Sequence, residues 1–151
     1  HFYKGQADWT AIGDVVEAVT IPVIANGDIV DSATASAALK ASGAKGVMVG
    51  RGAQGRPWVL AQIAAECFGG STPDIPTSNG LVDMIRGHYE AMLAFYGHTL
   101  GARVARKHLG WYLDDLGAVP DLRRAILTST STSDVLRLMA KAVHRADKVA
   151  A

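Results

Sequence analysis

Two short apolar runs in the first half of the chain constrain its fold more than any other feature. Runs 20–26 and 46–50 are rich in β-branched residues, and each ends at a turn that contains glycine. Near-continuous hydrophobicity over so few residues is typical of strands that are buried on both faces of a parallel sheet. Pro22 lies at the start of the first run, where a strand loses no ladder bond. We therefore expect two parallel strands here.

Helical patterns flank and separate these runs. Asp8 can cap a first helix, Asp31 a second that ends at Gly43, and Pro57 fits the first position of a third that runs to residue 67 or 68. The apolar face expected for the first helix consists of Trp9, Ile12, Val16 and Val19. Helices that alternate with short strands predict a parallel α/β arrangement.

This alternation stops at residue 68. Residues 69–80 are rich in Gly, Pro, Ser and Thr and predict a linker. Beyond it, apolar residues recur at helical spacing in four segments, the last of which opens with a capping-box pattern, Ser131 and Asp134. The first two segments carry Leu81, Ile85, His88, Met92 and Phe95, then Val104, His108, Tyr112 and Leu116. We expect residues 81–151 to form a small antiparallel helical bundle.

The two strand ends combine the parts of a phosphate site. Asn26–Gly27–Asp28 ends the first run and Gly50–Arg51–Gly52 ends the second, with a helix expected soon afterwards. Phosphate-binding (β/α)₈ barrels place their site after the last two strands. Glycine admits close backbone approach, a helix N-terminus supplies donors, and arginine can bind phosphate through two hydrogen bonds. Each motif alone is more often a turn, so the ordered pair favours phosphate without identifying the ligand.

Charge is distributed unevenly along the chain. Residues 1–100 carry six Lys/Arg and nine Asp/Glu, whereas residues 101–151 carry nine and five, so the net charges are −3 and +4. Arg103, Arg106, Lys107 and Gly110 share one face of a predicted helix, and further cations follow at Arg123, Arg124, Arg137, Lys141, Arg145 and Lys148. This basic end suits either an anionic partner or a solvated surface. His108 can stack on bases with its aromatic neighbours, but we expect Trp111 in the bundle core.

The sequence does not support a disulfide-bonded, membrane-spanning, secreted or metal-binding protein. The single cysteine, Cys67, cannot form an internal disulfide, and we interpret it as a small hydrophobic residue in a reducing compartment. Neither a membrane span nor a signal peptide is expected, and we expect no metal site. The chain begins at His1 without an initiator methionine, and we expect it to be a piece of a longer protein.

Four blocks carry a resemblance to a known family. Residues 3–9 (YKGQADW), 21–29 (IPVIANGDI), 50–58 (GRGAQGRPW) and 105–113 (ARKHLGWYL) resemble bacterial tRNA-dihydrouridine synthases, in their C-terminal portion. The resemblance covers nearly the whole chain. It implies that residues 1–68 are the last strands and helices of an FMN-binding (β/α)₈ TIM barrel, 69–80 a linker and 81–151 an all-α helical tRNA-binding domain.

The resemblance also implies a reaction and roles for particular residues. NADPH reduces the FMN, hydride passes to C6 of a tRNA uracil, and a cysteine protonates C5 to give 5,6-dihydrouridine. Asn26, Gly27 and Asp28 match one FMN-contacting stretch, and Gly50 and Arg51 match another. Arg103, Arg106 and Lys107 become candidate contacts to tRNA in a cytoplasmic enzyme.

The family's catalytic cysteine, and a lysine and histidine of its flavin pocket, belong to earlier barrel loops. We therefore expect no catalytic residue in this chain, no activity from the chain alone, and self-association through the exposed strand edges of the truncated barrel. Two alternatives remain open: a different phosphate-binding barrel that acts on a small metabolite, and a stand-alone RNA-binding module.

Overall fold

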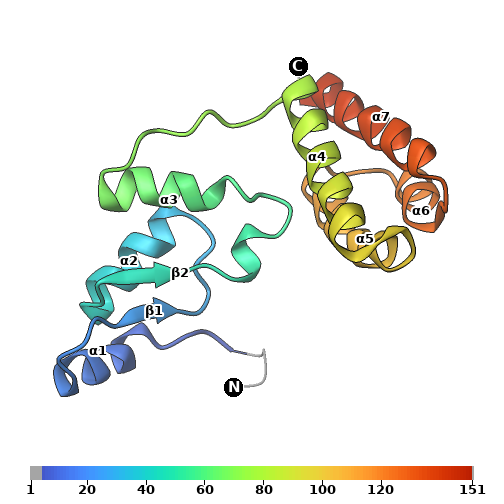
Figure 1. The fold of residues 1–151 in the computed structure, drawn as a ribbon. Coiled ribbons are helices and arrows are strands. Elements are labelled where there is room, and N and C mark those ends of the chain that lie inside the picture. The colour runs from blue at the N-terminus through green and yellow to red at the C-terminus, as the bar shows by residue number, and fades with distance from the viewer. Residues whose placement is uncertain (1–4, 151) are drawn as a thin grey trace. The chain divides into compact units, whose positions relative to one another are not determined.

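A computed structural model describes residues 5–150, in two compact units, His1–Asp74 and Ile75–Ala151 (Figure 1). The first four residues, which include the start of the 3–9 block, lie outside the described part. The first unit contains α1 (Trp9–Ala18), β1 (Ile24–Asn26), α2 (Ser32–Ser42), β2 (Gly46–Met48), the 3₁₀ turn η1 (Arg51–Ala53) and α3 (Val59–Phe68). The second contains α4 (Ser78–Tyr96), α5 (His98–Asp115), α6 (Pro120–Thr128) and α7 (Thr132–Ala150). Helix α4 thus begins inside the segment expected to be linker.

The first unit has the predicted parallel pairing. Strands β1 and β2 pair in parallel with Ala25 opposite Val47, and α2 connects them (Figure 1). Parallel strands end at the same edge of a sheet, so this register brings the turn after Asn26 close to the turn after Met48.

Both strands are shorter and more exposed than the sequence suggested. Each has three residues, and Ile24 and Met48 are 54% and 47% exposed, whereas Ala25 is fully buried. The expectation of burial on both faces is therefore wrong for this chain. The physical reason is that one face of the sheet is covered and the other is open: along β1, Ala25 is buried, while Ile24 and Asn26 point to the opposite face and are exposed. A buried cluster of Ile29, Ala35, Ala38 and Ile63 packs the sheet region against α2 and α3.

The predicted caps of the first two helices are confirmed. Asp8 accepts hydrogen bonds from the amides of Thr10 and Ala11, and Asp31 forms a reciprocal capping box with Thr34. Hydrogen bonds from the Thr34 amide and hydroxyl hold the pKa of Asp31 below its usual value. Gly43 ends α2 in the left-handed conformation, φ 67°.

Other helix details differ from the prediction. Val59 and Leu60 donate to the carbonyls of Arg56 and Pro57, so Pro57 lies in a tight turn and α3 begins two residues later than expected. Val19 follows α1 as its C-cap and is 38% exposed. At the start of α7, Asp134 completes only half of the capping box, because its carboxylate binds Arg137 rather than the Ser131 backbone.

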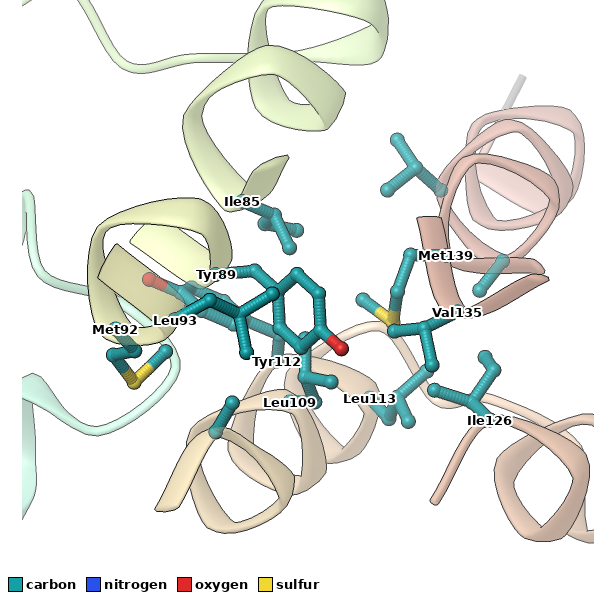
Figure 2. Close-up of a cluster of buried hydrophobic side chains, with 13 residues drawn as sticks. Ile85, Tyr89, Met92, Leu93, Leu109, Tyr112, Leu113, Ile126, Val135 and Met139 are labelled. Atoms are coloured by element: carbon teal, nitrogen blue, oxygen red, sulfur yellow. The ribbon is translucent and has the colours of Figure 1, made fainter. Parts of the chain in front are cut away.

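The four helices of the second unit share one hydrophobic core (Figure 2). Each helix contributes to a buried cluster of Ile85, Tyr89, Met92, Leu93, Ala105, Leu109, Tyr112, Leu113, Ile126, Val135, Met139, Ala142 and Val143. Of the residues predicted at helical spacing, Ile85, Met92 and Tyr112 belong to this cluster, and Leu81, Val104 and Leu116 pack against it as partly buried residues. Phe95 is an exception, since it is 81% exposed and lies close to the end of α4.

A glycine allows α4 and α5 to pack closely. Gly101 of α5 is buried, and a Cβ at this position would lie 2.7 Å from the Met92 carbonyl oxygen and 2.8 Å from the Leu93 Cα. Both neighbouring atoms belong to the backbone of α4, so neither can move without shifting that helix.

We expect Gly101→Ala to lower the free energy of unfolding by about 1–3 kcal/mol, because the added methyl overpacks the α4–α5 crossing. Gly87 in α4 is a matched control, because it is exposed and a Cβ there meets nothing within 4 Å. Gly87→Ala should raise stability by roughly 0.5–1 kcal/mol through helix propensity. Denaturant unfolding measures both changes, and equal stability of the two variants would contradict this packing.

Candidate functional site

A cleft of about 650 Å³ lies at the carboxyl ends of β1 and β2. Its wall consists of Gly5, Gln6, Ala7, Asp8, Asn26, Gly27, Asp28, Ile29, Val30, Met48, Gly50, Arg51 and Gly52. The structure thus brings together all five residues that the sequence suggested for phosphate binding. It adds the segment before α1, which sequence reasoning had not assigned to the site.

Asp28 connects three segments of this wall. Its backbone is left-handed at φ 52°, one carboxylate oxygen accepts the Ala7 amide at 2.7 Å, and the other lies 3.6 Å from a guanidinium nitrogen of Arg51. Aspartate tolerates this conformation better than most residues. The side chain therefore holds the segment before α1 and keeps Arg51 at the cleft.

Gly27 also binds the start of α1 and packs against the segment before it. Its φ is 114°, its carbonyl accepts the Trp9 indole N–H at 2.9 Å, and a Cβ there would lie 2.6 Å from the Ala7 Cβ. Glycine is required at this position for both conformation and space.

The two glycines around Arg51 have different surroundings. A Cβ on Gly52 would lie 2.5 Å from the Ile29 carbonyl oxygen and 2.7 Å from the Val30 Cα, so Gly52 allows the two strand-end loops to pack together. A Cβ on Gly50 would meet nothing within 4 Å, although Gly50 lines the cleft. The backbone at Gly50 therefore borders open space in the cleft.

The helix expected soon after Gly52, from Pro57, is present as α3 and begins at Val59. The three-residue turn η1 lies between, closed by bonds from the Ala53 and Gln54 amides to the Gly50 and Arg51 carbonyls. No residue of α3 lines the cleft, so the helix N-terminus suggested as a source of phosphate donors is not part of its wall. The cation at the cleft is Arg51, which is 65% exposed in its side chain.

The predicted cations of α5 lie on the surface of the second unit. Arg103, Arg106 and Lys107 are all exposed. Gly110, predicted on the same face, is instead buried beneath Arg123, whose guanidinium donates to the Gly110 carbonyl at 2.9 Å and pairs with Asp114 at 2.9 Å. Arg123 therefore fastens α6 to α5, and the close approach that Gly110 permits is made by this side chain.

Trp111 does not take the predicted place in the core. It is only partly buried and lies outside the hydrophobic cluster that contains its neighbour Tyr112. The α5 backbone turns Tyr112 inward, and one residue of helical rotation carries Trp111 away from the centre of the unit.

Residues 5–150 also bear on metal binding, on membrane spanning and on the place of Cys67. This part of the chain contains no group of three or more His, Cys, Asp or Glu that could hold a metal ion. None of its helices is long and apolar enough to span a membrane. Cys67 is partly buried against the Ser32 carbonyl and does not line the cleft.

The fold and the cleft define a parallel α/β unit with an arginine at its strand ends, followed by a basic all-helical unit. Comparison with known proteins makes the assignment specific. The sequence model of the dihydrouridine synthase family matches residues 1–148. The chain belongs to the dihydrouridine synthase family.

Named relatives agree with this assignment. The chain is 53% identical over 141 residues to a probable tRNA-dihydrouridine synthase of Rhodobacter capsulatus, covering 93% of this chain and 43% of the relative. It is 47% identical over 125 residues to a probable tRNA-dihydrouridine synthase of Rickettsia conorii, covering 83% and 38%. Over 132 residues it is 42% identical to tRNA-dihydrouridine synthase B of Xanthomonas axonopodis pv. citri, covering 87% and 40%. The chain thus spans about two fifths of the length of these curated relatives.

We expect Gly52→Ala to lower the free energy of unfolding by about 1–3 kcal/mol, because its methyl collides with backbone atoms of the neighbouring loop. Gly50→Ala should cost less, since the same methyl enters open space. Denaturant unfolding of both variants checks the difference. If Gly50→Ala proves the more damaging change, the packing described for these loops is wrong.

Proposed function

We propose that the chain is the C-terminal part of a flavin-dependent tRNA-dihydrouridine synthase that reduces uridine to 5,6-dihydrouridine in tRNA. Family membership supports the reaction class. One observation carries the assignment of this part of the chain: Asn26–Asp28 and Gly50–Arg51 converge on one cleft. In this proposal, residues 1–68 belong to the barrel, 69–80 are the linker and 81–151 are the tRNA-binding domain of a cytoplasmic enzyme.

The exposed strands support the barrel part of the proposal. Ile24, Ile21 and Met48 are roughly half exposed or more, although large apolar side chains at strands are normally covered. Further strands of a closed barrel would cover them. Without these strands, the same surface would favour self-association.

FMN is the proposed cofactor, and when reduced by NADPH it supplies the hydride for the uracil ring. The residues present fit its phosphate end. Gly50 leaves space that a Cβ would fill, and Arg51 brings a guanidinium whose several donors can serve Asp28 and a phosphate together. Asn26 and Gly27 line the same cleft. Asp28 adds negative charge, and we infer that it positions Arg51 rather than binding the phosphate itself.

The remaining chemistry is proposed to lie elsewhere in the enzyme. No residue of this chain is assigned the role of proton donor to the uracil ring, and Cys67 stands outside the cleft. The chain by itself is therefore proposed to be inactive. Its own contribution is to hold the cofactor's phosphate and to bind tRNA.

The proposed tRNA contacts are Arg103, Arg106 and Lys107 of α5. All three are exposed on one helix, and they lie in residues 101–151, which carry a net charge of +4. Cations that neutralise phosphates supply most of the sequence-independent affinity for nucleic acid. An enzyme that acted on a small metabolite would have no use for them.

In the full-length enzyme that contains this segment, we expect Arg51→Ala to weaken FMN binding by about 10- to 100-fold, because a charged hydrogen-bond donor is lost. Flavin fluorescence during titration measures the affinity. Lys40→Ala is the control, since Lys40 is an exposed cation in the last turn of α2 and does not line the cleft. Equal flavin affinity of the Arg51 variant and the parent would refute the role of Arg51.

Reversal of two α5 charges, Arg106→Glu with Lys107→Glu, should weaken tRNA binding on the order of tenfold or more near 0.1 M salt and flatten its salt dependence. The matched control is Lys141→Glu with Arg145→Glu on α7, which changes the net charge equally. Filter binding over a salt series reports both quantities. If the two double variants lose the same affinity, the effect is net charge and α5 is not the tRNA-binding helix.

A further inference from the structure

Four aromatic rings form a row in the second unit. His88 belongs to α4, and Tyr112, His108 and Trp111 belong to α5. The Tyr112 hydroxyl lies 3.0 Å from His88 Nδ1, the His88 and His108 ring centroids are 5.0 Å apart, and those of His108 and Trp111 are 4.9 Å apart. Each neighbouring pair of rings is close to perpendicular, at 72° to 90°. The row begins in the core at Tyr112 and ends at Trp111, which lies outside it.

The two histidines lie in surroundings that favour the uncharged ring. Burial lowers the pKa of His88, and burial together with the nearby His88 and Lys107 lowers the pKa of His108. Neutral imidazole rings offer a flat surface for stacking and do not repel the neighbouring lysine. The lowered pKa of both histidines thus favours a row of neutral rings over a pair of competing cations.

Lys107 shows which face of the row meets solvent. Its ammonium lies 5.2 Å from the centroid of the Trp111 ring, and the lysine is exposed. Since Lys107 is exposed and Trp111 is only partly buried, this face of the ring lies beneath a solvent-exposed side chain. A flexible lysine can leave that face when a flat group arrives, and the same lysine can then pair with a nearby phosphate.

Charge identifies the kind of partner that suits this surface. Arg103, Arg106 and Lys107 lie on α5 close in sequence to His108 and Trp111, which favours a polyanion with aromatic bases. Proteins that bind unpaired nucleic acid combine such a cationic surface with rings on which bases stack. Trp111 lies outside the hydrophobic cluster, so packing in that core does not account for its ring.

We propose that Trp111, supported by His108 and flanked by Lys107, is a stacking site for an unpaired base of the tRNA. This inference rests on the proposed function and adds to it. The α5 cations hold phosphates whether the RNA is paired or not, whereas Trp111 selects RNA in which a base is free to stack. We therefore expect the chain to bind folded tRNA more tightly than regular duplex.

The test uses the chain of residues 1–151 and two RNAs, a tRNA transcript and a fully paired duplex of similar length. Trp111→Leu should weaken tRNA binding by roughly 5- to 100-fold, the range typical of one stacked base, and leave duplex binding unchanged. The salt slope for tRNA should stay the same, because no phosphate contact is lost. Lys107→Ala should instead reduce that slope by about one.

Two further variants keep the result interpretable. Trp111→Phe retains a ring and should recover most of the tRNA affinity, which excludes misfolding as the cause of the loss. Phe95→Leu removes another ring of the same unit, 81% exposed, and should leave binding unchanged.

The outcomes separate this inference from the proposed function. Normal tRNA affinity of Trp111→Leu, or an equal loss for tRNA and duplex, would overturn the stacking site while leaving the α5 cations in place. Equal losses for Trp111→Leu and Phe95→Leu would also overturn it, because any exposed ring would then serve. Failure of the unaltered chain to bind either RNA would overturn both proposals.

Discussion

The carboxylate of Asp28 is shared between the Ala7 amide and the Arg51 guanidinium, and the cleft in the first unit depends on this sharing. The left-handed backbone at Asp28 directs the side chain back toward the segment before α1. The parallel register of β1 and β2 then brings Arg51 within reach. The Asp28 side chain thus joins parts of the chain that are distant in sequence. Gly50 lines the same cleft as the three segments that Asp28 connects.

The cations of the basic C-terminal segment, residues 101–151, are not equivalent. The Arg123 guanidinium donates to the Gly110 carbonyl and pairs with Asp114. These two contacts use its charge to stabilise the packing of α6 on α5. Arg103 and Arg106 remain exposed on α5. Net charge alone could not separate these roles, because the distinction depends on which carbonyls and carboxylates lie within hydrogen-bond distance.

The same division applies to the aromatic residues of α5. Tyr112 is buried in the core and its hydroxyl bonds to His88, while Trp111 is carried toward the surface, with Lys107 over its ring. Adjacent residues of one helix therefore serve packing and, in our proposal, recognition. The tRNA partner that we propose has the chemistry to match this arrangement, since an RNA supplies both phosphates and flat bases.

The sequence by itself determined the order of elements, the parallel pairing of two strands, the caps at Asp8 and Asp31 and the candidate residues at the strand ends. These follow from local rules: hydrophobic period, capping chemistry and glycine at turns. Only the tertiary structure decided how much of each strand is covered, that Gly110 meets Arg123, and that Trp111 lies outside the core. Burial and close approach depend on neighbours distant in sequence, and no periodic pattern within one element specifies them.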